Sequence, residues 1–321
     1  MKFGVIIVTY NRRELLRECL ECVLSQTLPF EEIYVVDNHS TDGTAEYLDG
    51  LEERLKGSEP PLLHIFHLDE NIGGAGGFSY GMERLSRGSC DWVLIIDDDA
   101  MISKTYMEEL ARAIRETDYL AYSGTVVTEG AIDISHRRRI KNPCLMTYAP
   151  VEASAYSAGS FEYDISTFCG LLLRTSLIRD IGLPKTEYFI WFDDTEYCLR
   201  FRKQSRILNV NRAVLNHKTA APGTGPVISW KHFYGFRNSI DIGKAYSSCP
   251  PLYMAYILAN HSAHILIDSL LLLSGRRKKD SGPSNADRRY RIRIYCDVLK
   301  DMGKRPSGRD SRYLPGSGPN K

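Results

Sequence analysis

The stretch Trp92–Ala100, "WVLIIDDDA", places three consecutive aspartates directly after an apolar run. The apolar run is typical of a buried β-strand. Like charges this close repel one another and raise each other's pKa unless a cation joins them. A helix N-cap would explain one acid, Asp99, but not three. The stretch therefore predicts that a strand end holds Mg²⁺ or Mn²⁺, whose coordination shell phosphate oxygens can complete.

Four more apolar, β-branched runs surround this stretch: Phe3–Tyr10, Glu32–Asn38, Leu62–Leu68 and Tyr119–Val127. Helical patterns separate them: Arg13–Ser25, Thr41–Leu55, Phe78–Ser86 and Lys104–Thr117. Strands that alternate with helices predict βαβ units, and hence an α/β fold with a mainly parallel central sheet flanked by helices. In such sheets ligands collect at the carboxyl ends of the strands. Polar residues stand at these ends: Thr9, Tyr10, Asn11, Asp37, Asn38 and Asn71.

The pattern changes after Thr128. The polar stretch up to Ser166, which contains "HRRR", is interpreted as an irregular excursion with a hairpin. A strand and helix follow in "STFCGLLLRTSLIRDIG", a helix begins in "YFIWFDDTEYCLRFRK", and "RILNVNRAVLNHK" is another strand. We expect a first domain at 1–225, a helical region at 226–303 and a disordered tail at 304–321, which is rich in Gly, Pro, Ser and charge.

Composition narrows the class of protein. A net charge of +1 gives no global sign of nucleic-acid binding. The eight cysteines do not form the two pairs of a zinc site, so we interpret them as free thiols in a reducing compartment. The first apolar run is too short for a membrane span and is not followed by a signal-peptide cleavage site. We therefore expect a cytoplasmic protein.

Asp37 and Arg12 each allow two interpretations. The Asp37 carboxylate can accept a base N–H or a ribose hydroxyl, or it can form an Asx-turn. The neighbouring Ser40, Thr41 and Asp42 are typical of helix capping. Arg12 can contact phosphate or can be a solvated charge at a helix start.

The segment "WFDDTEYCLR", Trp191 to Arg200, places Asp193 and Asp194 in the first turn of an expected helix. Acids are favoured there in any case. However, the aromatic approach "YFIWF" would form an apolar wall that suits a sugar ring and raises a carboxylate pKa, as a general base requires. Glu196 and Arg200 are four residues apart and can form a supporting salt bridge.

For His217 and for a glycine cluster, the residues alone leave more than one interpretation open. His217 closes the strand "AVLNHK" and is either a hydrogen-bonding residue or the third ligand of a metal held by carboxylates. "ENIGGAGGF", Glu70–Phe78, holds four glycines in nine positions. Such a cluster marks a phosphate loop, a tight turn or the rim of a sugar-nucleotide site.

Taken together and in order, these segments resemble an inverting family 2 glycosyltransferase of the GT-A fold. The matching segments are "VIIVTYNR", "VVDNHSTDGT", "ENIGGAGGF", "LIIDDDA", "FCGLLLR", "WFDDTEYCLR", "VLNH" and "FYGFRN". The form "NxGGAGGF" with "DDDA" and "WFDDxE" is similar to bacterial galactofuranosyltransferases. Many family members carry Arg-Asn further along the glycine loop, where this chain has Gly-Gly-Phe.

The resemblance implies a set of site residues. It makes Asp97, Asp99 and His217 the metal ligands, with Asp98 facing the ribose, and makes Asp194 the catalytic base. It assigns the donor site to Thr9, Tyr10, Arg12, Asp37, Asn71, Gly73, Gly74, Asp97 and Asp98. It assigns the sugar and acceptor pocket to Gly76, Gly77, Phe78, Trp191, Asp193 and Glu196. The glycine backbone would pass close to the donor sugar and diphosphate.

The implied function is metal-dependent, inverting transfer of galactofuranose from UDP-galactofuranose to a hydroxyl of a cell-surface glycan or a lipid-linked saccharide. A rhamnosyltransferase or another nucleotide-sugar donor on the same fold is one alternative, and a catalytically idle sugar-nucleotide-binding scaffold is another. Retention of both acidic motifs argues against the scaffold.

The C-terminal part contains an apolar segment, Leu252–Leu273, about long enough to cross a bilayer. Asn260, His261, His264 and Asp268 within it argue against a span. The basic sequences "GRRKK" and "RRYRIRIY" follow. Three interpretations stay open: solvated charge, peripheral attachment to an anionic inner leaflet, or a helical contact in a homo-oligomer.

Overall fold

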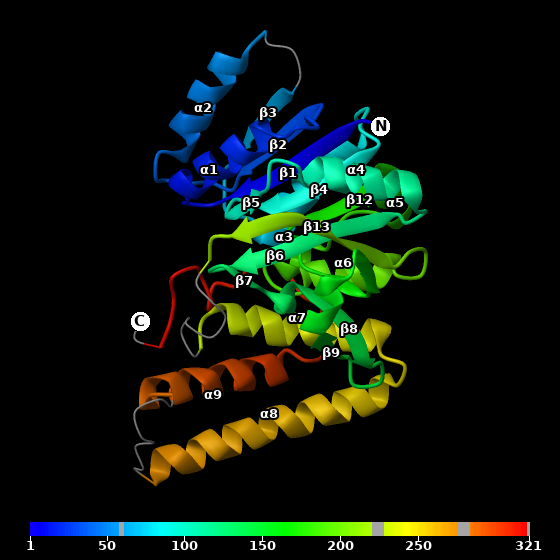
Figure 1. Ribbon diagram of the computed structural model, residues 1–321. Coiled ribbons are helices and arrows are strands. Elements are labelled where there is room, and N and C mark those ends of the chain that lie inside the picture. Colours follow the sequence, from blue (N-terminus) through cyan, green and yellow to red (C-terminus); the bar gives the residue numbers. More distant parts are fainter. Residues whose placement is uncertain (58–60, 220–227, 275–282, 320–321) are drawn as a thin grey trace. The chain divides into compact units, whose positions relative to one another are not determined.

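The computed structural model describes residues 1–57, 61–219, 228–274 and 283–319 (Figure 1). The chain forms two compact units. Unit 1 consists of 1–139, 149–186 and 194–221, and unit 2 consists of 140–148, 187–193 and 222–321. The expected boundary at 225 falls within 220–227, outside the described residues. The two short inner segments of unit 2 differ from the expectation of one continuous first domain.

The first half of the central sheet is parallel, as the alternating pattern predicts. Strands β1 (Phe3–Thr9), β2 (Glu32–Asp37), β3 (Leu62–His67) and β4 (Trp92–Asp97) pair in the order β3-β2-β1-β4. Helices α1 (Arg13–Leu24), α2 (Thr44–Leu55), α3 (Gly73–Ser86) and α4 (Tyr106–Glu116) alternate with the strands. Every residue of β1 is buried, because both faces of the sheet are covered.

The second half of the sheet is mixed. Strand β12 (Leu171–Arg174) lies antiparallel between β4 and β6 (Ala121–Thr128), and β13 (Ile207–His217) runs parallel to β6. Three strands add antiparallel: β10 (Ser160–Tyr163) and β5 (Ala100–Ile102) on β13, and β7 (Ala131–Ile132) on β6. Helices α5 (Thr175–Ile181) and α6 (Asp193–Phe201) follow β12 in the chain, as predicted.

The polar excursion contains the expected hairpin. Strands β8 (Arg137–Asn142) and β9 (Thr147–Pro150) form a small sheet with β11 (Ile165–Ser166), in the order β11-β8-β9. Three short 3₁₀ helices are also present. η1 (Ile134–His136) and η2 (Ala153–Ser157) belong to unit 1, and η3 (Thr186–Tyr188) begins at the end of a unit 1 segment and continues into unit 2.

Helix α3 begins at Gly73, five residues before the predicted start at Phe78. The glycines therefore form the first turns of a helix rather than an open loop. A Cβ on Gly77 would lie 2.6 Å from Val8 Cγ1, and one on Gly81 would lie 2.6 Å from Ile6 Cγ2. Glycine permits this close approach of α3 to β1. Helix propensity misplaced the helix start because glycine is a poor helix former.

Unit 2 contains three long helices within the predicted helical region 226–303: α7 (Lys231–Tyr246), α8 (Pro250–Leu273) and α9 (Asn285–Lys300) (Figure 1). The tail expected to be disordered is instead described as far as residue 319 and packs on them through Arg312 and Tyr313. Tyr313 is fully buried and its ring stacks on Phe233 at 4.2 Å. Arg312 pairs with Asp301 and Asp310. The basic tract 276–279 lies outside the described residues.

Candidate functional site

The ends of four strands bring the predicted polar residues together in unit 1. β1 lies between β2 and β4, and the register pairs Thr9 with Asp37 and Val8 with Asp97. β13 pairs with β5 so that His217 lies opposite Ala100. The Lys218 N–H donates to the Asp99 carbonyl at 2.8 Å, which fixes the chain after the acids against the end of β13. One sheet edge therefore gathers acids and an imidazole that are far apart in the sequence.

Arg12 bridges two of the three aspartates. Its Nη1 lies 3.1 Å from Asp98 Oδ1 and 2.6 Å from Asp99 Oδ2. The Thr9 hydroxyl donates to the other Asp98 oxygen at 2.7 Å. Asp98 and Asp99 are both buried, whereas Arg12 is half-exposed. Arg12 is therefore a countercharge of the acids here, which neither of the two interpretations of this residue anticipated.

The metal ligands implied by the resemblance lie close together. His217 Nε2 is 3.1 Å from Asp99 Oδ1. One ligand atom each from Asp97, His217 and Cys169 lies within 4.8 Å of the others. His217 Nδ1 is buried and has no hydrogen-bond partner in the described part of the chain. Carboxylates with an imidazole form a donor set that suits Mn²⁺ or Mg²⁺, so these residues fit a divalent cation.

Electrostatics distinguish the three acids. Burial, together with the Asp99 charge, raises the pKa of Asp97 to about 7. Burial also raises the pKa of Asp98 to about 6, although Arg12 and the Thr9 hydrogen bond oppose it. Burial works in the same direction on Asp99, but its contacts with His217 and Arg12 outweigh it and lower the pKa of that carboxyl. Such a spread within one cluster is typical of a functional site.

A second layer of residues supports His217, and the sequence reasoning missed it. The His136 ring stands edge-on to the His217 ring, with centroids 5.0 Å apart. His136 Nδ1 lies 2.7 Å from the Thr167 hydroxyl, and its Nε2 lies 3.4 Å from Asp133 Oδ2. The sequence "HRRR" was the available signal, but only the folded path of the segment 128–166 places His136 beside His217.

Arg137, beside His136, is fully buried and carries its charge among neutral acceptors. It donates to the carbonyl oxygens of Gly124 at 2.8 Å and Cys169 at 3.1 Å, and to Ser166 Oγ at 3.1 Å. These bonds tie β8 to β6 and to the segment before β12. No pattern in the sequence assigns a role to this arginine.

Asp37 is buried and accepts a backbone N–H three residues on, whereas the Asx-turn that was one of its two interpretations would join it to the residue two positions on. Its Oδ1 accepts the Ser40 N–H at 3.0 Å, and its Oδ2 lies 3.0 Å from His67 Nδ1. Burial would lower the pKa of His67, but hydrogen bonds to Asp37 and Asp49 outweigh it and raise that pKa. The contact with a base or ribose stays a prediction.

In the loop after β2, Asp42 makes helix-start contacts as expected, whereas Ser40 and Thr41 contact Asn11 instead. Asp42 accepts the Arg13 N–H at 3.0 Å and the Thr44 N–H at 3.2 Å, so it binds the first turns of α1 and α2. The Asn11 side-chain oxygen accepts the Thr41 N–H at 2.7 Å. Tyr10, which precedes Asn11, is exposed.

Two asparagines shape the start of α3. Asn71 Oδ1 accepts the Gly73 N–H at 2.8 Å. The Asn38 side chain accepts the Ile72 N–H at 2.9 Å and donates to the Gly73 carbonyl at 3.0 Å. Around a Cβ on Gly74 nothing lies within 4 Å, so this backbone is open to a ligand.

The glycines further into α3 have packing partners. Gly76 faces the Ile72 side chain and Gly77 faces Val8. Phe78 is buried with its ring edge-on to Phe168 at 5.0 Å. Packing therefore accounts for these three residues, and their predicted contact with a sugar stays a prediction.

Asp194 lies at the start of α6 and belongs to unit 1. Its Oδ1 accepts the Thr195 hydroxyl at 2.9 Å and also the Thr195 N–H. Arg138 Nη2 donates to the same Thr195 oxygen at 3.1 Å. Glu196 is buried and pairs with Arg200 and Lys185. The supporting salt bridge considered for Glu196 is therefore present.

The aromatic segment before Asp194 belongs to unit 2 and is strained. Phe189, Trp191 and Phe192 all have positive φ, between 64° and 69°, which bulky residues rarely adopt. Asn238 Nδ2 holds this turn through carbonyls that include Trp191 O at 2.8 Å. The Trp191 ring is partly exposed, 39%, whereas Asp193 is buried. Strain of this kind clusters at functional sites.

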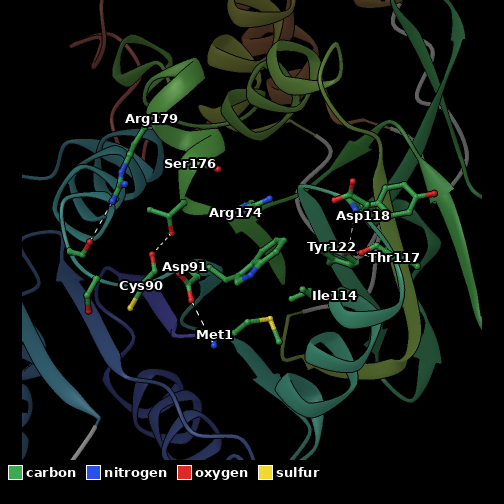
Figure 2. A pocket seen from close by; sticks show the side chains of 15 residues that line it. Met1, Cys90, Asp91, Ile114, Thr117, Asp118, Tyr122, Arg174, Ser176 and Arg179 are labelled. Atoms are coloured by element: carbon green, nitrogen blue, oxygen red, sulfur yellow. Dashed lines mark hydrogen bonds and ion pairs between the residues drawn. The ribbon is translucent and has the colours of Figure 1, made fainter.

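A surface pocket of about 580 Å³ lies at the start of β4, at the opposite sheet edge from the acids. Figure 2 shows the side chains that line it. Met1, Asp91, Trp92, Arg174 and Arg179 are among its lining residues. Trp92 begins β4 and Asp97 ends it, which separates the two edges by about 16 Å. The pocket is therefore not the site that the acids form.

Comparisons with known proteins agree with this geometry. Residues 4–179 match the model of the protein family described as "Glycosyl transferase family 2". Galactofuranosyltransferase GlfT1 of Mycolicibacterium smegmatis is 27% identical over 195 residues, 60% of this chain and 62% of the relative. Glycosyltransferase GlyG of Streptococcus pneumoniae is 30% identical over 167 residues, 51% of this chain and 53% of the relative. These matches span less than two thirds of each relative.

Two solved structures show the same fold. "GalNAc-T7 with UDP, GalNAc and Mn2+" aligns with a TM-score of 0.62 and 12% identity, over 94% of this chain and 57% of that one. S. aureus "TarS 1-349 in complex with UDP" aligns with a TM-score of 0.55 and 16% identity, over 99% of this chain and 98% of that one. The fold class expected from the sequence is confirmed.

Proposed function

Because the chain belongs to glycosyltransferase family 2, we propose that it transfers a sugar from a nucleoside diphosphate donor to an acceptor hydroxyl, with inversion at the anomeric carbon. One observation carries this proposal. The ends of β1, β4 and β13 gather Thr9, Asp97–Asp99 and His217 at one sheet edge, beside Asp37 at the end of β2. This arrangement suits a cation–diphosphate pair at the carboxyl ends of the strands.

The proposed donor is UDP-galactofuranose. Two features support it: the similarity to proteins named galactofuranosyltransferase GlfT1, and the segments "NIGGAGGF" and "WFDDTE". Asp37 would accept from the uracil or the ribose, and Asp98 would face the ribose. The open backbone at Gly74 leaves room for the donor at the start of α3. A dTDP-rhamnose donor would keep the same fold and chemistry.

Asp97, Asp99 and His217 would hold Mn²⁺ or Mg²⁺. When bound, the cation would supply positive charge against the charge that develops on the leaving diphosphate. Arg12 already neutralises Asp98 and Asp99. We expect its guanidinium to turn toward the diphosphate when the donor binds, because phosphate oxygens accept its paired N–H groups well.

Asp194 would act as the base. It accepts the proton of the acceptor hydroxyl while that oxygen forms a bond to the anomeric carbon. The bond from that carbon to the diphosphate oxygen breaks, and its electron pair leaves with the diphosphate. Attack opposite the leaving group inverts the centre. Thr195, held by Arg138, fixes Oδ1 of Asp194.

The acceptor class we propose is a growing cell-surface glycan or a lipid-linked saccharide on the cytoplasmic side. The role of an idle scaffold is disfavoured, because binding alone would need neither Asp194 nor the complete acid cluster.

Release of UDP tests the reaction, with UDP-galactofuranose, UDP-galactopyranose and dTDP-rhamnose offered separately with Mn²⁺ and a galactoside acceptor. We expect turnover of the furanose donor and loss of turnover in EDTA that Mn²⁺ restores. Full activity in EDTA would contradict the metal assignment, and turnover of another donor would contradict only the sugar.

The Asp194→Asn variant tests the base. We expect a loss of turnover of at least about 100-fold with unchanged UDP affinity by calorimetry. Asp180→Asn, at an exposed acid of α5, is the matched control and is expected to retain activity. Equal turnover in both variants would refute the assignment of Asp194.

A further inference from the structure

Helix α8 in unit 2 has one face that is apolar from end to end and exposed. Its large exposed side chains are Leu252, Tyr256, Leu258, Leu266, Ile267, Leu270 and Leu273. Leu266 is 60% exposed and Leu270 is 56% exposed. The remaining exposed positions of the helix are Pro251, Ala255, Ala259, Ser262 and Ala263, so the face carries no charge. Contiguous exposed apolar surface of this kind marks an interaction site.

The opposite face of α8 packs within unit 2. Tyr253 donates to the Ser239 carbonyl of α7 at 2.8 Å. Asp268 is buried and accepts two hydrogen bonds from Arg291 of α9, at 2.7 and 2.6 Å. The His261 ring contacts the Phe236 and Tyr295 rings of α7 and α9. Only one side of the helix is therefore available to a partner.

We propose that this exposed face of α8 docks on a lipid surface with anionic headgroups, with the helix lying in the plane of the interface. A helix of 24 residues is about 36 Å long. It can therefore bury its row of leucines in the boundary between headgroups and acyl chains over its whole length.

The charge of this part of the chain complements an anionic surface. Residues 222–321 contain 17 Lys and Arg against 7 Asp and Glu, whereas residues 1–221 contain 24 against 33. Arg289, Arg293 and Lys300 are exposed along α9, which lies beside α8 (Figure 1). Basic residues near an apolar helix add attraction to anionic lipid.

The acids of α8 and α9 do not oppose this attraction, because each is engaged. Asp268 is paired with Arg291. Asp287 forms the capping box of α9 with Ser284. Asp297 accepts the Tyr313 hydroxyl at 2.8 Å. The exposed charges of these two helices, within the described residues, are therefore all basic.

A span across the bilayer and a second copy of the chain both fit less well. Among the described helices, α8 is long and apolar enough to cross a membrane by its length and composition alone. However, a span would have to separate Asp268 from Arg291 and leave a carboxylate in hydrocarbon, which is costly. A second copy on this face would bring together two C-terminal parts that each have an excess of Lys and Arg over Asp and Glu, and like charges repel.

Flotation with vesicles tests the proposal on the full chain. The vesicles are phosphatidylcholine alone, or phosphatidylcholine mixed with phosphatidylglycerol. We expect the wild type to float with the mixed vesicles and to bind less as salt is raised. The Leu266→Glu/Leu270→Glu double variant should lose roughly 100-fold or more in partition coefficient. Arg289→Gln/Lys300→Gln should lose about 30-fold on the anionic vesicles only.

Leu62→Glu is the matched control, because Leu62 of β3 is 53% exposed but lies in unit 1. It should bind vesicles like the wild type. Melting temperatures confirm that each variant is folded. The proposal is overturned if the wild type does not float, or if Leu62→Glu loses binding equally. It is also overturned if the wild type does not bind vesicles but is a dimer by light scattering, and Leu266→Glu/Leu270→Glu dissociates that dimer. A third overturning result is that only detergent releases the wild type from the vesicles, as expected of a membrane span.

Discussion

The three aspartates at the end of β4 are neighbours in the sequence but have three different environments. Asp97 is near Cys169 and His217, Asp98 accepts from Thr9 and Arg12, and Asp99 lies between Arg12 and His217. Their pKa values differ for this reason, with those of Asp97 and Asp98 raised and that of Asp99 lowered. The pKa of each aspartate therefore depends on partners that other elements contribute.

Asp133 is expected to act on the metal site through His136. The carboxylate lies 3.4 Å from His136 Nε2, and the His136 ring packs against His217. Asp133→Asn should weaken Mn²⁺ binding by about 10- to 100-fold, as loss of outer-shell support does. Calorimetric titration measures this affinity, and Asp69→Asn, at an exposed acid, is the control. Equal Mn²⁺ affinity of the two variants would contradict the role of Asp133.

His261 should make unit 2 sensitive to acid. Burial between the Phe236 and Tyr295 rings, with His264 nearby, lowers its pKa to about 4. In the unfolded chain the same imidazole has a pKa of about 6.5. The contribution of His261 to the free energy of unfolding is therefore fully present above that pH. It falls by up to a few kcal/mol as the pH drops from about 6.5 toward 4.

Urea unfolding at pH 7.5 and pH 5 measures this effect. His261→Gln should lose less stability between the two pH values than the wild type does. His39→Gln, at an exposed histidine, should behave like the wild type. An unchanged pH dependence in His261→Gln would show that another group is responsible.

The elements are positioned by apolar packing on both faces of the sheet. On β1, Val5 and Ile7 join the core formed with Leu16 and Leu20 of α1. Ile6 and Val8 instead face the glycines of α3. The packing of α3 on β1 sets the position of the helix start, with Asn71 just before it and the open backbone of Gly74 in its first turn.

Gly77→Ala should destabilise unit 1. Its Cβ would lie 2.6 Å from Val8 Cγ1, so α3 or Val8 must shift. Overpacking of this kind costs about 1–3 kcal/mol. Gly74→Ala is the matched control in the same helix, because its Cβ would meet nothing within 4 Å. Chemical denaturation should show Gly74→Ala unchanged or stabilised by about 1 kcal/mol, and similar losses in both would contradict the packing argument.

At the scale of the whole molecule, the chain is a GT-A fold with a separate helical unit, and its charge is unevenly distributed. The excess of acids in residues 1–221 and of bases in residues 222–321 cancels to a net charge of +1. Sequence-wide composition therefore conceals both the acidic site and the basic C-terminal part. Tyr313 of the tail also belongs to unit 2, because its ring packs in the aromatic core of that unit.

Tyr313→Ala tests this role of the tail. Tyr313 is fully buried, stacks on Phe233 and donates to Asp297. Its loss should cost about 3–5 kcal/mol of unfolding free energy. Leu314→Ala, next in the chain and 36% exposed, should cost under about 1 kcal/mol. Thermal unfolding that is the same in both variants would show that the tail does not stabilise unit 2.

The sequence by itself determined β1–β4, β6, β12 and β13, most helix bounds and the gathering of Thr9, Asp37 and Asp97–Asp99, but not the short strands β5, β7, β10 and β11. Hydrophobic periodicity and parallel topology are local or combinatorial rules, so they can be applied without coordinates. The tertiary structure alone decided that Arg12 bridges the acids, that His136 and Asp133 stand behind His217, and that the glycines of α3 pack on β1. These depend on distances between residues that are far apart in the chain, and periodicity carries no information about such distances.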